Sequence, residues 1–217
     1  MELNGKVGII TGGVGGIGQA MAKKFLLQGA RAIVLADLDE ARLKASASEI
    51  GCDWRTCDVT DEKQVRSLIE YTLREYGCVD LYCSNAGASG SQSGALTDAA
   101  NDVWYQQWDL HVMAHVYATR ALLPSMIKRG SGYFLITASA AGLLAALGSG
   151  AYSVTKAAAV KLAEMLAINH GDEGIKASVL CPQGVNTAMA PKSLGDGQTD
   201  GILAVSYTHL TLPTILL

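Results

Sequence analysis

The regular alternation of apolar runs with segments of helical periodicity is the feature that most constrains how this chain folds. Short runs rich in Val, Ile, Leu and Ala are followed by longer segments whose apolar residues recur every three or four positions. Such runs predict strands, and such segments predict helices. Strands that alternate with helices favour a parallel sheet covered by helices on both faces. The sequence therefore predicts an α/β fold.

The expected elements can be placed along the chain. Strands are expected at residues 7–10, 32–36, 54–57, 79–83, 133–137 and 176–180. Helices are expected at residues 16–27, 40–50, 61–76, 103–128 and 151–170. We expect the longest helix to bend or end near Pro124, because a proline inside a helix removes a backbone hydrogen bond.

Composition narrows the class of protein. Hydrophobic residues make up 49% of the chain and charged residues 17%, which is typical of a globular protein and not of a disordered one. The net charge of -3 comes without a basic run, so we expect no nucleic-acid partner. No apolar stretch has the length of a membrane span, and residues 1–6 lack the features of a signal peptide, so we expect no membrane partner.

Cysteine and histidine usage indicates a cytoplasmic protein without a metal site. The five cysteines are odd in number and form no C-x-x-C pair, which is typical of reduced thiols in the cytoplasm. The four histidines are not spaced as metal ligands, so no metal is expected.

Residues 11–18 form a glycine-rich segment, Thr-Gly-Gly-Val-Gly-Gly-Ile-Gly, directly after the first expected strand. Backbone N–H groups and a helix N-terminus in such a segment can hold the pyrophosphate of a dinucleotide. Gly12, Gly16 and Gly18 fit the spacing T-G-x-x-x-G-x-G, with Ile17 before the last glycine. The spacing T-G-x-x-G-x-x-G fits equally, so the motif alone leaves two related families open. The alternative is a plain glycine-rich turn, and the position between a strand and a helix argues against it.

Asp37 ends the second expected strand, nineteen residues after Gly18. A carboxylate there can accept hydrogen bonds from the adenosine ribose hydroxyls, and it would repel the extra phosphate of NADP. No Lys or Arg lies in the glycine-rich segment to bind that phosphate. We therefore expect NAD rather than NADP as the cofactor. The alternative is that Asp37 merely begins a turn.

Polar and small residues also follow the third and fourth expected strands. Asp58 and Val59 follow the third strand, and Asn85, Ala86 and Gly87 follow the fourth. Ligands bind at such carboxyl ends in open α/β sheets. On chemistry alone, both segments fit ordinary turns equally well.

Tyr152 and Lys156 stand four residues apart, and Ser139 precedes the tyrosine by thirteen residues. Residues four apart share one face of a helix. A lysine held there can lower the pKa of a phenol from about 10, and the phenol can then exchange a proton near neutral pH. A proton donor beside a dinucleotide indicates hydride transfer to or from a carbonyl. The alternative, a solvent-facing pair on a helix, is common for an isolated Y-x-x-x-K.

These segments, in this order and spacing, resemble the short-chain dehydrogenase/reductase family in its short, single-domain form. The resemblance covers about residues 5–190. Besides the segments above, which include Ser139, residues 182–187 also match. It implies a Rossmann-like doubly wound parallel sheet with helices on both faces. It also implies NAD(P)-dependent oxidation of an alcohol or reduction of a carbonyl.

The resemblance assigns roles residue by residue. Tyr152 corresponds to the general acid/base, Lys156 to the residue that lowers its pKa and holds the nicotinamide ribose, and Ser139 to the group that stabilises the substrate oxygen. Cofactor contacts are implied for adenine at Asp58 and Val59, for the adenosine ribose region at Asn85, Ala86 and Gly87, and for the nicotinamide amide at Val185 and Thr187.

Two positions depart from the family pattern. His111 occupies the place of an asparagine that completes a catalytic tetrad and helps to hold a proton-conducting water. Imidazole titrates near neutral pH, so His111 either relays protons, crowds the water out, or is a helix histidine with no role. Gln183 lies where the family has glycine, and Gly184 follows it, which fits a shifted turn.

The end of the chain departs further. The family continues past residues 182–187 with a loop, a helix and a seventh strand, so we expect the last strand to be missing here. Residues 205–214 resemble the translation of a sequencing-library adapter. We therefore expect one truncated NAD(P)-binding domain over residues 1–204 and a non-native tail over residues 205–217. The alternative is a genuine divergent tail.

Taken together, these residues predict an NAD-dependent oxidoreductase that interconverts a secondary alcohol and a ketone or aldehyde. The partner is a small-molecule alcohol or carbonyl substrate, and the resemblance implies a homo-oligomer for a full-length member. The alternative function is a catalytically impaired or non-catalytic nucleotide-binding protein, since a fold alone does not establish activity.

Overall fold

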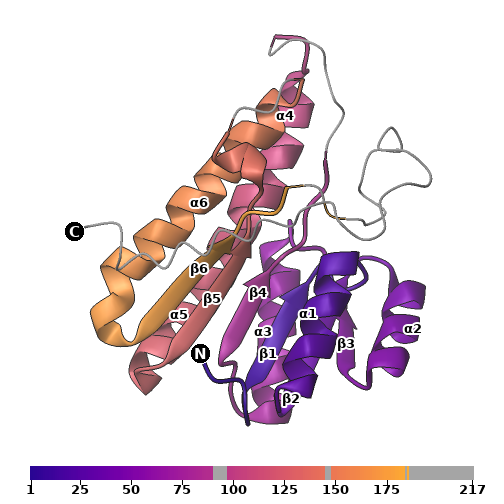
Figure 1. The fold of residues 1–217 in the computed structure, drawn as a ribbon, viewed down its shortest axis with the longest axis vertical. Helices are drawn as coiled ribbons and strands as arrows, with labels where there is room; N and C mark the ends of the chain where they lie inside the picture. Colours follow the sequence, from indigo (N-terminus) through magenta and orange to yellow (C-terminus); the bar gives the residue numbers. More distant parts are fainter. Residues whose placement is uncertain (90–96, 145–147, 184, 186–217) are drawn as a thin grey trace.

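The structure, a computed structural model, describes residues 1–89, 97–144, 148–183 and 185 (Figure 1). The expectations for Thr187 and for residues 205–217 therefore lie outside the described residues. Within them the chain alternates strands and helices from Val7 onwards.

In the described part of the chain, six strands form one parallel sheet in the order β3-β2-β1-β4-β5-β6. The order runs outward from β1 in both directions, so the topology reverses between β1 and β4. Ligands of open α/β sheets bind in the crevice at such a reversal, outside the carboxyl ends of the strands. The strands are β1 (Val7–Thr11), β2 (Ala32–Asp37), β3 (Asp53–Thr56), β4 (Leu81–Ser84), β5 (Gly132–Thr137) and β6 (Ile175–Leu180).

Helices pack on both faces of this sheet and create two apolar cores. On one face α1 and α2 cover a cluster that contains Ile10, Leu35 and Leu43. On the other face α3, α5 and α6 cover a larger cluster that contains Tyr82 and Phe134. These helices are α1 (Gly16–Leu27), α2 (Glu40–Ile50), α3 (Glu62–Tyr76), α4 (Asn101–Trp108), α5 (Ala114–Arg129) and α6 (Gly150–His170). The expected doubly wound Rossmann-like fold is confirmed.

The long helix expected at residues 103–128 contains an irregularity that the sequence did not predict. It does not end at Pro124, because α5 continues through that residue to Arg129. Leu122 and Met126 are fully buried on either side of the proline, and this packing against the core offsets the lost hydrogen bond. The irregularity lies instead at a π-helical segment, η1 (Asp109–Met113), which joins α4 to α5. Such single π-turns often occur at functional sites.

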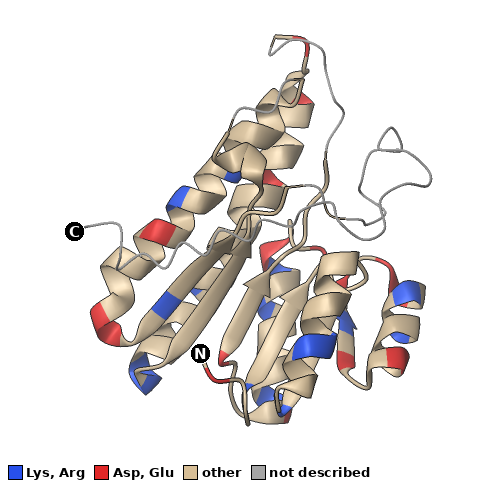
Figure 2. Ribbon diagram, viewed as in Figure 1, with Lys and Arg blue, Asp and Glu red and all other residues tan. Residues whose placement is uncertain are grey.

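The described residues show how the charges, the cysteines and the potential metal ligands are placed. In the view of Figure 2, acidic and basic residues are interspersed on the helices. None of the described helices combines the length and hydrophobicity that a membrane span requires. All five cysteines are unpaired, and the described residues contain no cluster of three or more potential metal ligands.

Candidate active site

The glycine-rich segment links β1 to α1 in a turn that requires glycine at particular positions. Gly12 has a φ of 65°, which favours glycine. A Cβ atom on Gly18 would lie 2.4 Å from the Gly12 carbonyl oxygen, and a Cβ on Gly12 would lie 2.9 Å from the Ala86 Cα. The turn therefore brings backbone of α1 and of the loop after β4 close together at the carboxyl edge of the sheet.

The N-terminus of α1 is suited to hold a pyrophosphate. Its N-cap is Gly15, which forms no side-chain cap, and its first turn contains no acidic residue. The first backbone N–H groups of a helix have no partner within it, and the helix dipole places partial positive charge there. Gly16 and Ile17, the first residues of this helix, are exposed and half-buried, respectively. Their N–H groups can therefore reach a phosphate, and the segment fits a dinucleotide.

Two charged side chains hold one residue of the glycine turn. Oδ2 of Asp37 accepts a hydrogen bond of 3.2 Å from the Val14 N–H. Nη2 of Arg42 donates one of 3.2 Å to the Val14 carbonyl oxygen. Arg42 was missed by sequence reasoning, which searched for basic residues only inside the glycine-rich segment. Its place in the first turn of α2, just after Asp37, is the signal that would have found it.

The Asn85 side chain is fully used in joining strand ends. Nδ2 donates to the Thr11 carbonyl oxygen at 2.9 Å, and Oδ1 accepts from the Thr137 hydroxyl at 3.0 Å. The Thr11 hydroxyl in turn accepts from the N–H groups of Asn85 and Ala86. Asn85 thus ties β1 to β5 across β4. The cofactor contacts expected of Asn85, Ala86 and Gly87 stay predictions.

Asp58 and Val59 lie at the carboxyl end of β3 and form a turn. Oδ1 of Asp58 accepts from the N–H and the hydroxyl of Thr60, at 2.9 and 2.7 Å. The Val59 side chain is buried in the larger core. The segment therefore forms an ordinary turn. Because it lies at the end of a strand, a contact with adenine stays a prediction.

Lys156 lies on α6 and is almost completely buried. Its Nζ donates a hydrogen bond of 2.9 Å to the Thr137 carbonyl oxygen. Burial lowers its pKa from 10.5 to about 8, with Cys181 opposing the shift slightly. An ammonium group has three N–H donors, so two remain after the bond to Thr137. The site therefore has one buried, mostly charged donor at neutral pH.

Tyr152 lies one turn before Lys156 on α6, and Ser139 approaches it from the carboxyl end of β5. Lys156 Nζ is 5.6 Å from the centre of the phenol ring. Burial raises the pKa of Tyr152, and the nearby Ser139 hydroxyl partly offsets that rise. Ser139 Oγ also accepts from the Ala141 N–H at 3.2 Å, which fixes its direction. Burial thus outweighs the effect of Ser139, and the lowered pKa that the sequence predicted for this phenol is not found in this structure.

His111 lies in the π-helical segment and is fully buried. Its ring contacts the Tyr152 ring edge to face, with centroids 5.3 Å apart and an interplanar angle of 87°. Burial and the charge of Lys156 lower its pKa from 6.5 to about 2, so the ring is neutral at physiological pH. The structure therefore places His111 against the same tyrosine and lysine as the sequence did.

The remaining predicted position that the structure describes is Val185, which is half-buried beyond β6. Thus the structure brings Ser139, Tyr152, Lys156 and His111 together. The glycine turn, Asp37 and the loop after β4 extend from them along the same edge of the sheet.

Comparison with known proteins gives consistent matches. A family model described as short chain dehydrogenase matches residues 6–196. The chain is 32% identical to (+)-cis,cis-nepetalactol synthase NEPS3 of Nepeta racemosa, covering 87% of this chain and 71% of that protein. It is also 32% identical to 1-deoxy-11-beta-hydroxypentalenate dehydrogenase of Streptomyces exfoliatus, covering 90% and 74% of the two chains.

A solved structure agrees with the sequence matches. A short chain dehydrogenase/reductase from Burkholderia phymatum in complex with NAD superimposes with a TM-score of 0.82 and 30% identity. The match covers 92% of this chain and 75% of that one.

Proposed function

Because the chain belongs to the short-chain dehydrogenase family, we propose that its site interconverts a secondary alcohol and a ketone or aldehyde with NAD as the cofactor. The type of activity, NAD(P)-dependent oxidation of alcohols and reduction of carbonyls, follows from the family. The observation that carries the proposal is the convergence of Tyr152, Lys156 and Ser139 on the edge of the sheet where the glycine turn lies. The NAD complex of the Burkholderia phymatum relative supports the choice of cofactor.

The chain's own residues would hold the cofactor along this edge. The first N–H groups of α1 bind the pyrophosphate, and Asp37 accepts from the adenosine ribose. Asp58 and Val59 contact the adenine, and the two free N–H groups of Lys156 bind the nicotinamide ribose. Val185 and Thr187 orient the amide of the nicotinamide, which supplies or accepts hydride when bound.

Proton transfer is assigned to Tyr152. In the reduction direction, the carbonyl carbon gains hydride and its oxygen takes the phenolic proton, which leaves a tyrosinate. The ammonium of Lys156 stabilises that tyrosinate, and the Ser139 hydroxyl donates to the oxygen as charge develops on it. In the oxidation direction the tyrosinate takes the proton of the alcohol.

The direct test is turnover. The chain is mixed with NADH and a panel of ketones and aldehydes, or with NAD and secondary alcohols, and the absorbance of NADH is followed. We expect NADH to be consumed with some carbonyls of the panel. NADH binding without turnover on any of them would instead support a non-catalytic nucleotide-binding protein.

NADH should bind more tightly than NADPH, by roughly 10- to 100-fold, or ~1–3 kcal/mol. The reason is that the Asp37 carboxylate, held against Val14, would face the extra phosphate. Asp37→Ala should narrow the gap, because the carboxylate that repels the extra phosphate is gone while Arg42, which lies against the same residue Val14, still carries its positive charge there. Adding Arg42→Ala to Asp37→Ala should remove the improvement in NADPH affinity.

Fluorescence titration of both cofactors measures these affinities in the wild type and the two variants. NADPH binding as tight as NADH in the wild type would show that Asp37 is not the determinant.

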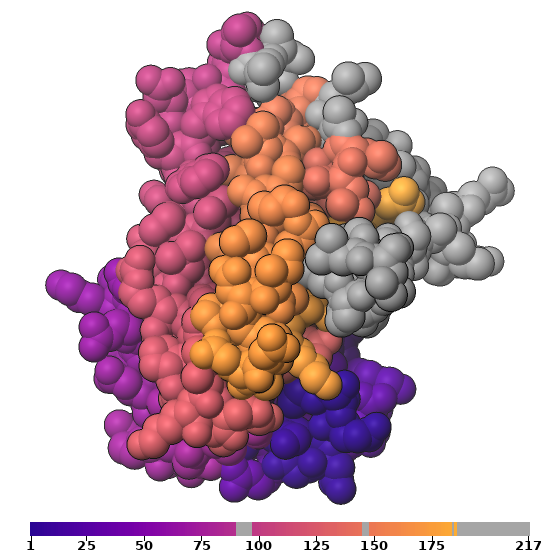
Figure 3. Space-filling model, turned by 90° about the vertical axis from the view of Figure 1, so that its left-hand side faces the viewer, coloured from indigo at the N-terminus to yellow at the C-terminus, as the bar shows by residue number. Residues whose placement is uncertain are grey.

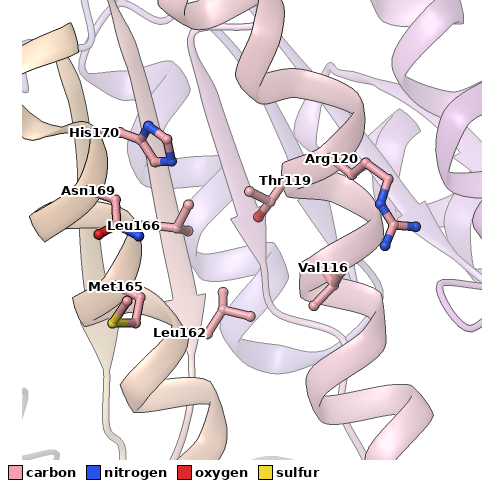
Figure 4. A pocket seen from close by; sticks show the side chains of 8 residues that line it. All are labelled: Val116, Thr119, Arg120, Leu162, Met165, Leu166, Asn169 and His170. Atoms are coloured by element: carbon pink, nitrogen blue, oxygen red, sulfur yellow. The ribbon is translucent and has the colours of Figure 1, made fainter.

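We also propose a homo-oligomer that associates through α5 and α6. These helices lie side by side on one face of the molecule (Figure 3). Between them Val116 and Leu162 line an apolar groove of about 240 Å³ (Figure 4). Met165 and Ile168 on α6 are about half exposed beside it, and a second copy would cover them. Light scattering should give twice the chain mass or a multiple of it, and Met165→Glu should lower that mass.

The compartment is proposed from the cysteines. All five thiols are unpaired, and burial raises the pKa of Cys52 and Cys57 to about 11 and about 12, which keeps them unreactive. This supports a reducing compartment, the cytoplasm.

A further inference from the structure

Both ring nitrogens of His111 are hydrogen-bonded inside the protein. The Ala88 N–H donates to Nε2 at 3.2 Å, and Nδ1 lies 3.1 Å from the Thr155 hydroxyl oxygen. Ala88 lies in the loop after β4, and Thr155 precedes Lys156 on α6. The imidazole therefore spans the gap between the predicted cofactor loop and the helix that bears the tyrosine and the lysine.

The partners determine which nitrogen of His111 carries the proton. A backbone N–H can only donate, so Nε2 must present its lone pair to Ala88. A neutral ring then carries its proton on Nδ1. The single hydroxyl hydrogen of Thr155 is directed to the carbonyl oxygens of Ala151 and Tyr152, at 2.9 and 3.0 Å. The Thr155 oxygen is therefore free to accept from Nδ1–H, and every donor in the set has an acceptor.

This arrangement leaves the ring no means of passing a proton. Its one lone pair is occupied by Ala88, its one N–H is occupied by Thr155, and the side chain has no exposed surface. A relay would require one of these bonds to break inside the core, where a polar group left without a partner is unfavourable.

We propose that His111 is a positioning residue that ties the loop after β4 to α6 through Ala88 and Thr155, and that it carries no proton during turnover. The inference rests on the proposed function, because it concerns the geometry of that same site. It selects among the three roles that the sequence left open for this histidine.

The position of Gly87 shows what this tie controls. A Cβ on Gly87 would lie 3.3 Å from His111 Nε2 and 3.4 Å from Lys156 Nζ. The loop backbone thus lies directly over both groups, and its height above Lys156 is set by the imidazole beneath it. The imidazole also supports the Tyr152 ring from one side. Loss of the tie should displace the loop, the lysine and the tyrosine relative to one another.

The charged and titratable groups around His111 are few. Lys156 and Tyr152 face it from α6, and His115 faces it from α5, where burial and the charge of Lys156 lower the pKa of His115 to about 3. None of these groups offers an acid that would protonate His111 near neutral pH. The two hydrogen bonds of His111 should therefore persist across the pH range in which the enzyme works.

The first experiment needs no activity. The wild-type chain is labelled with ¹⁵N at its histidines, and the ring spectrum is recorded from pH 5 to pH 9. Resonances that disappear in His111→Gln are assigned to His111. We expect a protonated Nδ1, an unprotonated Nε2 and no change with pH. A protonated Nε2, or a ring that titrates in this range, would overturn the proposal.

The second experiment uses a matched pair of variants at Thr155. Thr155→Val keeps the shape but removes the acceptor, and we expect kcat to fall ~10-fold and the NADH dissociation constant to rise several-fold. Thr155→Ser keeps the hydroxyl, so its kcat and its NADH dissociation constant should be close to those of the wild type. The apparent pKa values in the kcat profile should be the same in all three proteins, because only the geometry changes.

An ionisation between pH 5 and pH 8 that is present in the wild type and lost in Thr155→Val would instead identify His111 as a proton carrier. A wild-type chain that binds no NADH would contradict the proposed function, while the ring spectrum would still decide the role of His111.

Discussion

Tyr152→Phe should lower kcat by ~100- to 10,000-fold and leave the NADH dissociation constant within about threefold of wild type. The substitution removes the phenolic proton and keeps the ring, which contacts His111 and lies beside Lys156. Proton transfer is therefore lost while the packing remains. Steady-state rates and fluorescence titration on the same preparation measure the two effects separately.

The matched control for this variant is Tyr105→Phe. Tyr105 lies on α4 and is 68% exposed, so losing its hydroxyl should change neither quantity. If Tyr152→Phe retained more than a few per cent of the wild-type rate, the general acid would have to be another group.

Lys156→Met should reduce both turnover and cofactor binding. We expect kcat to fall at least ~100-fold and the NADH dissociation constant to rise by ~10-fold or more. The reason is that the Tyr152 tyrosinate and the nicotinamide ribose both lose a charged hydrogen-bond donor. Lys161→Met is the control, since this lysine is on the same helix but faces solvent. A variant that lost turnover but bound NADH normally would remove the ribose contact from the proposal.

The same lysine should give a pH-dependent stability effect of known sign. Burial lowers its pKa from 10.5 to about 8, so between these values the unfolded chain binds more protons at this residue than the folded one. Stability contributed by this residue therefore rises with pH across that window. Thermal unfolding of wild type minus that of Lys156→Met should show the rise, while a flat difference would contradict the burial of a charged lysine.

Sequence patterns predicted the parts of this molecule that depend on local order. The strands differ from expectation by one or two residues, and the glycine turn lies between β1 and α1 as its spacing indicated. Tyr152 and Lys156 share a face of α6 because residues four apart do so in any helix.

Features that depend on contacts distant in sequence were not predictable in this way. Arg42 reaches the glycine turn only because β1 and β2 are neighbours in the sheet. The Asn85 side chain joins strands whose pairing the sequence does not state. The π-helical segment holds His111 against Ala88, 23 residues away in the sequence, whereas the proline rule pointed to a different turn of the same helix.

The most direct test of the account is a crystal structure of the chain with NADH. We expect the pyrophosphate at the N-terminus of α1, the adenosine ribose against Asp37, and the nicotinamide ribose within hydrogen-bonding distance of Lys156 Nζ. The reactive face of the nicotinamide should then lie beside the Tyr152 hydroxyl. NADH bound away from this edge of the sheet, for example in the groove between α5 and α6, would contradict the central claim.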